Sequence, residues 1–399
     1  ATDAIELHRK RGKDGSKSGQ ALIFDNSPID LEEFLRDYWQ QKPCLIRSAF
    51  PGFEPDLDAD DIAGLACDEL AESRLITGSF PAHDLCLRYG PFGESDFVSL
   101  PQDNWTLLVQ DVDKHYPPLK KFLDHFDFIP GWRIDDLMVS VAAPGGSVGP
   151  HVDQYDVFLF QAAGKRKWQV AEKYESELLS DCDLNVLLDF WPEQEWSLEA
   201  GDMLYLPPGI AHHGTAVETC MTWSVGMRAP SEADVLQSLG EWLAASRSEG
   251  ARYRDPPLAL TSRPGEVDAQ AVDRFRQLAS SSAKGQEFVE FLGVFLSRYR
   301  LAHEPAPPES GVDPDQLMES LQAGQALKQN PWTRLLWLAS GSDALLFAAG
   351  SAYRCDPELA IRICDPSRLE RIRQPGGEAE ISLLCKLVND GHLYLEDRS

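Results

Sequence analysis

The sequence is short of positive charge. Its 399 residues include 64 Asp and Glu against 37 Lys and Arg, which gives a formal net charge of −27 and a pI near 4.6. The negative electrostatic field of such a chain repels nucleic acid and attracts basic partners, although net charge does not predict the fold. The composition therefore argues against duplex DNA as the main ligand and favours a basic polypeptide.

Closely spaced cysteines and long apolar runs are both absent. The eight cysteines are scattered with no C-x-x-C pair, so the sequence gives no sign of a zinc ribbon or a thioredoxin-like site. Scattered cysteines in a chain of this size are typical of small buried side chains in a reducing compartment. No apolar run reaches the length that a membrane span requires. We therefore expect a cytoplasmic protein that does not enter a membrane.

Residues 1–20 are polar and lack the apolar core of a signal peptide. Gly, Ser and Lys dominate this segment, which predicts a flexible tail. The basic run from His8 to Arg11 leaves a second interpretation open, an arm that binds a partner.

A hydrophobic content of 43% and a length of 399 residues predict a globular protein of two or three domains. Helix and strand patterns alternate over residues 21–229, beginning with a helix over 31–41 that Asp30 would cap. Helical periodicity with little strand signal fills residues 230–304. A Pro-rich linker and a small α/β module, ordered like a winged helix, occupy residues 305–399. No internal repeat is evident.

The stretch from Pro144 to Gly214 carries the clearest chemical pattern. His151 and Asp153 are two positions apart on a predicted strand, and such residues project from the same face. Another histidine, His212, follows 212 − 151 = 61 residues later, after an apolar strand and a Pro-Pro-Gly turn. Two histidines and one carboxylate form the ligand set of non-haem Fe(II) oxygenases. We interpret these three residues as a metal site.

The segment from Gly201 to His212 supports this interpretation. It has the spacing G-x5-P-x-G-x2-H, found in the second half of cupin barrels. Gly and Pro build the tight turn that delivers a strand-borne histidine to the barrel interior. The spacing selects His212 over His213, because adjacent residues on a strand face opposite sides. Glu218 stays open as an alternative to Asp153, with weaker support.

Arg166 lies near the start of the strand that follows the turn at Gly164. It shares one strand face with Trp168 and Val170, while lysines and a glutamine share the other. The aromatic and aliphatic neighbours mark the first face as inward, so the guanidinium would be a buried cation in need of an anion. A carboxylate of 2-oxoglutarate would meet that need, since guanidinium binds carboxylate bidentately. The alternative is an internal salt bridge to Asp or Glu.

The JmjC-type 2-oxoglutarate oxygenases resemble this chain in two core segments. These are DDLMVSVAAPGGSVGPHVDQYDVFLFQAAGKRKWQV (135–170) and GDMLYLPPGIAHHGTAVE (201–218). Within that group the chain is most similar to the bacterial ribosomal oxygenases, the arginine hydroxylases of protein L-sixteen in the large ribosomal subunit. The same family is suggested by FLRDYWQQKPCLIRSAF (34–50) and TWSVGMRAPS (222–231). The resemblance extends over nearly the whole chain from Ala21.

The resemblance implies a fold that is mainly β with α. A double-stranded β-helix, which is a jelly-roll or cupin-like JmjC barrel, would form an oxygenase domain over 21–229. A helical dimerisation segment would follow over 230–304, and the linker and winged-helix-like module over 305–399. The family's middle segment makes homodimers, which fits the apolar faces of residues 287–296. Those faces could instead simply cover the barrel.

The resemblance also implies Fe(II) as the metal, with O2 and 2-oxoglutarate as co-substrates. The implied ligands are His151, Asp153 and His212. Arg166 would bind the distal carboxylate of 2-oxoglutarate, with Ser140 as its hydroxyl partner. A shifted strand register would put a different residue there, Ala142 or Val139.

The expected function is therefore hydroxylation of an arginine in a basic ribosomal protein, with no membrane and no direct DNA binding. Histidyl hydroxylation or lysyl demethylation on the same scaffold is the alternative among enzymes. A non-catalytic scaffold that binds through the winged-helix-like module is the alternative from another class. A metal-dependent cupin isomerase is a third option, which the H-x-D pattern disfavours.

Overall fold

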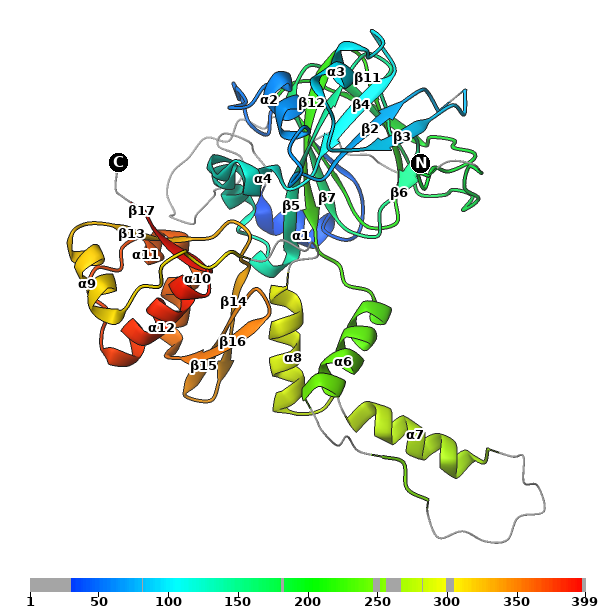
Figure 1. The fold of residues 1–399 in the computed structure, drawn as a ribbon. Helices are drawn as coiled ribbons and strands as arrows, with labels where there is room; N and C mark the ends of the chain where they lie inside the picture. The colour runs from blue at the N-terminus through cyan, green and yellow to red at the C-terminus, as the bar shows by residue number, and fades with distance from the viewer. Residues whose placement is uncertain are drawn as a thin grey trace, which may run out of the picture. The chain divides into compact units, whose positions relative to one another are not determined.

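The computed structural model describes residues 30–80, 82–180, 183–246, 252–255, 267–281, 283–298 and 305–396 (Figure 1). The tail expected at 1–20 lies outside these residues, as does Cys182. The chain divides into two compact units, Ala1–Ala229 and Pro230–Ser399. Within the described ranges, no helix is both long and apolar enough to cross a membrane.

Two antiparallel sheets form the first unit. The larger has the strand order β1-β10-β7-β12-β5-β4-β2-β3 and the smaller has the order β6-β11-β8-β9. Their strands are β1 (Cys44–Ile46), β2 (Ser73–Thr77), β3 (Cys86–Tyr89), β4 (Trp105–Val109), β5 (Ile134–Ala142), β6 (His151–Val152), β7 (Val157–Ala163), β8 (Arg166–Ala171), β9 (Gln194–Leu198), β10 (Met203–Leu206), β11 (Ala211–Ala216) and β12 (Cys220–Met227). From β5 to β12 the chain passes back and forth between the two sheets, except at β8 and β9, which are neighbours in the smaller one. This is the alternation of the expected double-stranded β-helix.

Short helices accompany the sheets. They are α1 (Leu31–Asp37), α2 (Ala59–Leu65), α3 (Glu94–Val98), α4 (Val112–His115) and α5 (Lys120–Leu123), with 3-10 turns at η1 (Pro117–Leu119), η2 (Asp124–Phe126) and η3 (Gly131–Arg133). The predicted N-cap of α1 is confirmed, because the Asp30 carboxylate accepts a hydrogen bond from the Glu32 backbone N–H at 2.9 Å. This helix ends at Asp37, earlier than its periodicity suggested.

The central strands of the larger sheet are buried on both faces. Its outer face packs against the N-terminal helices through an aromatic cluster in which Phe34, Phe158 and Tyr205 are in ring contact. Its inner face meets the smaller sheet through aliphatic side chains and Trp168. Full burial of one such side chain, for example Phe158, stabilises the fold by roughly 1.5–3 kcal/mol. The two cores together hold the barrel strands in register.

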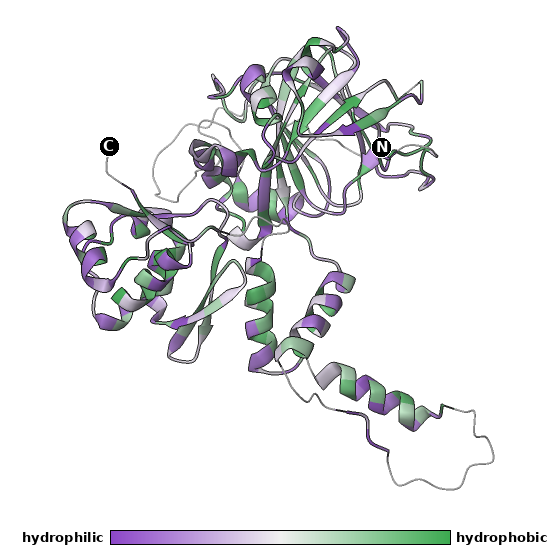
Figure 2. Ribbon diagram, in the orientation of Figure 1, coloured by the Kyte–Doolittle hydropathy of each residue, from purple (hydrophilic) through white to green (hydrophobic). Residues whose placement is uncertain are grey.

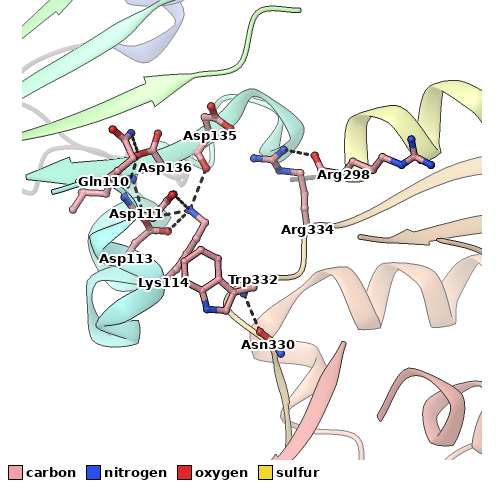
Figure 3. A network of polar contacts seen from close by, with 11 residues as sticks. Gln110, Asp111, Asp113, Lys114, Asp135, Asp136, Arg298, Asn330, Trp332 and Arg334 are labelled. Carbon is pink, nitrogen blue, oxygen red and sulfur yellow. Dashed lines mark hydrogen bonds and ion pairs between the residues drawn. The ribbon is translucent and has the colours of Figure 1, made fainter. Parts of the chain in front are cut away.

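A polar network braces β4 against β5 (Figure 3). The Gln110 amide donates to the buried carboxylate of Asp136. Lys114 forms ion pairs with Asp111 at 3.0 Å and with Asp113 at 3.2 Å. The Asp113 carboxylate also accepts a hydrogen bond from the Leu137 backbone at 2.9 Å. Because these contacts join the segment after β4 to Asp136 and to the Leu137 backbone, the network fixes the position of β5 in the sheet.

The second unit consists of helices and two small sheets. Its helices are α6 (Glu232–Ser246), α7 (Ala269–Ser281), α8 (Gln286–Ser297), α9 (Pro314–Gln322), α10 (Pro357–Cys364), α11 (Pro366–Leu369) and α12 (Glu378–Asn389). Its strands are β13 (Ala326–Gln329), β14 (Leu335–Ser340), β15 (Asp343–Ala348), β16 (Ser351–Cys355) and β17 (Leu393–Glu396). β13 pairs with β17, and β14, β15 and β16 form a three-stranded sheet. The layout expected for a winged-helix-like module is thus present.

Helix α8 uses its apolar face within the chain. Figure 2 shows this helix as largely hydrophobic, and its residues Phe291 and Val294 are buried. Val294 packs against Leu345 and Phe347 of β15. A Cβ at Gly293 would lie only 2.2 Å from the Phe347 ring, so the helix approaches the sheet closely. Part of the apolar face of residues 287–296 therefore covers the C-terminal sheet, while Phe288, Leu292 and Phe295 stay partly exposed. The dimer interface expected in this segment stays a prediction.

Candidate metal centre

His151 is placed by a glycine-containing loop that leads into β6. Gly149 has φ +79°, and a Cβ there would lie 2.8 Å from Val186. The carbonyl oxygen of Gly149 accepts a hydrogen bond from Nδ1 of His151 at 3.0 Å. This bond fixes the ring so that Nε2 is left free to bind a metal.

His212 is placed by the turn that the sequence predicted. Gly209 lies in the left-handed region at φ +80°, and its N–H donates to the Asp153 carbonyl at 2.8 Å. In the β6–β11 ladder, His212 stands directly opposite His151. Its Nδ1 bonds to the Ile210 carbonyl at 3.0 Å, which repeats the arrangement at His151. One turn thus fixes both the second histidine and the backbone of the carboxylate residue.

The three predicted residues converge. One ligand atom from each of His151, Asp153 and His212 lies within 4.8 Å of those of the other two. The Asp153 carboxylate is 3.6 Å from Nε2 of His212 and 4.0 Å from Nε2 of His151. His212 is buried while the other two are partly exposed, so the cluster opens on one side. Two imidazoles and one carboxylate on one side of a point suit a metal with open positions.

Electrostatics favour the neutral form of the buried ligand. Burial, and after it the neighbouring His151, lowers the pKa of His212 to about 4. The ring is therefore uncharged near neutral pH, which is the form that metal binding requires. The donor set fits a divalent transition metal such as iron.

The alternative ligands point elsewhere. His213 lies on the opposite face of β11, where its ring contacts Phe80 at 5.4 Å and Phe190 at 6.1 Å between centroids. Glu218 is exposed on the turn after β11. The metal cluster found among the described residues contains neither His213 nor Glu218.

Arg166 lies inside the barrel, as the strand alternation predicted. Its side chain is buried, and Nη2 donates to the Gly214 carbonyl at 3.2 Å. Its Nε and Nη1 have no hydrogen-bond partner among the described residues, and no described carboxylate lies within 4.0 Å of it. Burial lowers the pKa of Arg166, but a guanidinium stays charged in proteins. The internal salt bridge is thus not realised, and the site holds a cation without a counterion.

Two further residues shape the space in front of Arg166. The guanidinium lies over the Trp168 ring at 5.2 Å, and that ring is 6.0 Å from His212. A Cβ at Gly214 would lie 2.7 Å from both Arg166 and Trp168. The alternation of Arg166 and Trp168 in the sequence indicates that the tryptophan also faces inward. The need for a residue without a side chain at Gly214 follows only from the β8–β11 register, in which Gly214 stands opposite Trp168.

Ser140 faces the barrel interior from β5 and is buried. Its hydroxyl donates to the Thr222 carbonyl at 3.4 Å. The residue two positions on, Ala142, pairs with Cys220, whose thiol lies against the Arg166 guanidinium. The role expected for Ser140 therefore remains a prediction.

Comparison with known proteins supplies the class and the family. The JmjC domain family matches residues 121–235, and the ROXA-like winged helix family matches residues 280–394. A cupin-like barrel with this domain and two histidines beside a carboxylate defines a JmjC-type 2-oxoglutarate oxygenase, the enzyme class that the sequence predicted. The second family begins at residue 280, ahead of the boundary expected at 304–305, and includes α8.

Similarity over full length narrows the class. The chain is 33% identical over 376 residues to the Escherichia coli ribosomal protein uL16 3-hydroxylase, covering 92% of this chain and 98% of that one. It is 32% identical to a probable ribosomal oxygenase of Haemophilus influenzae, covering 92% and 96%. An Escherichia coli YcfD ribosomal oxygenase structure in complex with cobalt and 2-oxoglutarate matches with a TM-score of 0.80 and 31% identity, covering 93% and 99%. The chain belongs to the ribosomal oxygenase family.

Proposed function

We propose that the chain uses Fe(II), O2 and 2-oxoglutarate to hydroxylate an arginyl residue of ribosomal protein uL16. The observation that carries the proposal is the buried, unpaired guanidinium of Arg166 beside a histidine–carboxylate–histidine cluster. This combination offers one place for a metal and another for an anionic co-substrate. The substrate is supported by the relative from Escherichia coli that is named a uL16 3-hydroxylase.

The side chains have distinct roles in this proposal. The ligands of the iron are His151, Asp153 and His212. When bound, iron and 2-oxoglutarate together activate O2, placing one oxygen atom in a substrate C–H bond and the other in succinate, with release of CO2. Arg166 holds the distal carboxylate, Trp168 forms a wall beside it, and the apolar contacts between the sheets exclude water. The protein thus supplies geometry and a dry pocket.

The charge distribution fits a basic substrate. The segment between β8 and β9 packs beside the metal cluster, because the Leu187 N–H donates to the Pro150 carbonyl at 2.8 Å. Several exposed carboxylates lie along it, namely Glu172, Glu175, Glu177, Asp183, Asp189 and Glu193. They would attract a basic ribosomal protein to this side of the barrel. A ribosomal substrate also agrees with the cytoplasmic location that the composition predicts.

Incubation of the purified chain with uL16, Fe(II) and 2-oxoglutarate tests the activity. We expect tandem mass spectrometry to find one added oxygen on one arginine, with succinate formed in equal amount. An oxygen on histidine instead, or loss of methyl groups from lysine, would favour the alternative chemistries on this scaffold. No 2-oxoglutarate turnover with any ribosomal protein would leave a non-catalytic scaffold as the better explanation.

A homodimer is part of the proposal. Helix α7 buries no side chain, although Val272 and Phe275 are among its exposed large hydrophobic residues. A second copy of the chain could cover them, which is the arrangement expected of the family's helical segment. Analytical ultracentrifugation should show a dimer, and Phe275→Asp should shift it to monomer. A wild-type monomer at micromolar concentration would refute this part of the proposal.

The domain division expected from the sequence also remains a proposal. An oxygenase domain over 21–229 would be followed by a helical segment over 230–304 and by the linker and winged-helix-like module. Limited proteolysis with mass identification of the stable fragments would test these boundaries.

A further inference from the structure

Some buried polar side chains of the barrel strands have no hydrogen-bond partner. In the described part of the chain, buried atoms without a partner include Nε and Nη1 of Arg166, Nε1 of Trp168 and Oγ1 of Thr106. A buried polar group without a partner costs roughly 1–3 kcal/mol, so such groups are rare unless a ligand satisfies them. Arg166 and Trp168 belong to the site already described. Thr106 has no role in it so far.

Thr106 lies on β4 and points towards the barrel interior. Its neighbour Leu107 packs into the outer core, so strand alternation directs Thr106 to the inner face. Thr106 stands opposite Ala142 on β5, and Ala142 stands opposite Cys220 on β12. The Cys220 thiol lies against the guanidinium of Arg166. Thr106 and Arg166 therefore border the same small region of the interior from two sides.

Small residues line the region between them. Ala142, Ala216 and Cys220 form one buried cluster, and Ala216 stands opposite Arg166 in the β8–β11 ladder. The glycine loop joins the cluster, because the Gly146 carbonyl accepts a hydrogen bond from the Ala216 N–H at 3.0 Å. A Cβ at Gly146 would lie 3.0 Å from the Thr106 hydroxyl. A side chain at position 146 would therefore crowd the hydroxyl, and glycine avoids this contact.

We propose that the Thr106 hydroxyl donates a hydrogen bond to the distal carboxylate of 2-oxoglutarate, as the second donor beside Arg166. The inference rests on the proposed use of 2-oxoglutarate. A carboxylate offers about four acceptor positions, which is more than the unsatisfied nitrogens of one guanidinium can fill. Ser140 is the other candidate, but its hydroxyl already donates to the Thr222 carbonyl, whereas Thr106 is fully buried with no partner among the described residues.

Calorimetry on the full chain tests the inference without turnover. Co(II) takes the place of iron in this experiment, and 2-oxoglutarate and 2-oxovalerate are titrated separately. These two ligands share the keto and C1-carboxylate groups, but only the first has a distal carboxylate. The variants are Thr106→Val, which keeps the shape and removes the hydroxyl, and Thr106→Ser, which keeps the hydroxyl. Thr77→Val is the matched control, because Thr77 is a partly exposed threonine of β2 outside the site.

We expect Thr106→Val to raise the Kd of 2-oxoglutarate about 10-fold or more, the effect of a hydrogen bond to a charged group, and to leave the Kd of 2-oxovalerate unchanged. Thr106→Ser should restore most of the affinity. The metal-free Thr106→Val protein should melt at the same or a higher temperature than wild type, since it loses an unsatisfied hydroxyl.

Three results would overturn the inference. They are an unchanged Kd for 2-oxoglutarate in Thr106→Val, an equal loss for both ligands, and a lower melting temperature of the metal-free variant, which would show that the hydroxyl bonds within the protein. A wild-type chain that binds no 2-oxoglutarate with Co(II) would instead refute the proposed function itself. The two failures are therefore distinguishable.

Discussion

His151 and His212 stand opposite each other in the β6–β11 ladder, with ring centroids 4.2 Å apart. Each ring bonds through Nδ1 to the carbonyl oxygen two residues before it, at 3.0 Å in both cases. The two Nε2 atoms are therefore left with lone pairs that the protein does not use. Since Asp153 lies within 4.0 Å of both, the cluster is preorganised for a metal by backbone hydrogen bonds.

Removing the carboxylate from this cluster should abolish tight metal binding. Asp153→Asn keeps the shape but loses the negative charge, and we expect the Kd for Co(II) to rise by more than about 100-fold, beyond the range typical of residues that only support a ligand. Anaerobic calorimetry measures the change. Glu218→Gln is the matched control, because it removes the other carboxylate considered for the site and should leave the Kd unaltered. A raised Kd in Glu218→Gln with an unchanged Kd in Asp153→Asn would show that Glu218, and not Asp153, is the metal ligand.

Replacing the buried cation should separate folding from ligand binding. Arg166→Met removes a buried charge that has no counterion. The free energy of unfolding of the metal-free variant should therefore exceed that of the wild type by about 1 kcal/mol or more. The affinity for 2-oxoglutarate should fall at least about 100-fold, as for loss of one partner from a buried charge pair. Urea denaturation and calorimetry give the two quantities.

The control for Arg166 is its neighbour Lys167, which is partly exposed and pairs with Glu195 at 3.5 Å. Lys167→Met should change neither quantity, because a surface ion pair contributes little. Lower stability of Arg166→Met would indicate that the guanidinium has a structural role instead.

Much of the metal cluster could be predicted because it depends on local geometry. The two-residue period of a strand places His151 with Asp153 and separates His212 from His213, and a Pro-Gly turn is visible in the sequence. The same period predicted that Arg166 faces inward. None of these inferences needs knowledge of which strands are neighbours.

Features that depend on strand register or on long-range packing could not be read in this way. Thr106, Ala142 and Cys220 meet only because β4, β5 and β12 are adjacent, and nothing local encodes that order. Helix α8 shows the same limit, since its sequence reveals an apolar face but not what covers it. That face packs on β15 of the same unit.

Crowding at Gly214 should make this position intolerant of a methyl group. In Gly214→Ala the new Cβ would lie 2.7 Å from Nε of Arg166 and equally close to the Trp168 ring. Overpacking of this kind costs about 1–3 kcal/mol, and relief by movement of Arg166 would displace the anion-binding group. We expect a lower melting temperature and a higher KM for 2-oxoglutarate, with Co(II) affinity retained. Gly226→Ala is the control, because its Cβ would meet only ordinary contacts, the nearest at 3.5 Å. Equal effects of the two substitutions would attribute the loss to strand flexibility in general.

His392 should make the C-terminal unit sensitive to acid. The ring is buried beside Tyr353 and Thr333, and burial lowers its pKa from the ordinary value of 6.5, with Asp390 opposing and Lys386 adding to the shift. The unfolded chain therefore takes up the proton first as the pH falls. Stability is complete above about pH 6.5 and declines below it, until the folded state is also protonated.

Hydrogen exchange of peptides from α12 and β17, corrected for the intrinsic pH dependence, measures this local stability in the full chain. We expect protection to weaken as the pH falls below about 6.5 in wild type and to stay nearly constant in His392→Asn, which has no titrating ring. His83→Asn is the control, since His83 is exposed in the other unit and should leave the wild-type profile in place. His392 lies in the turn between α12 and β17, and residues 378–396 contain no other histidine. A wild-type-like profile in His392→Asn would therefore assign the acid sensitivity to groups other than histidine.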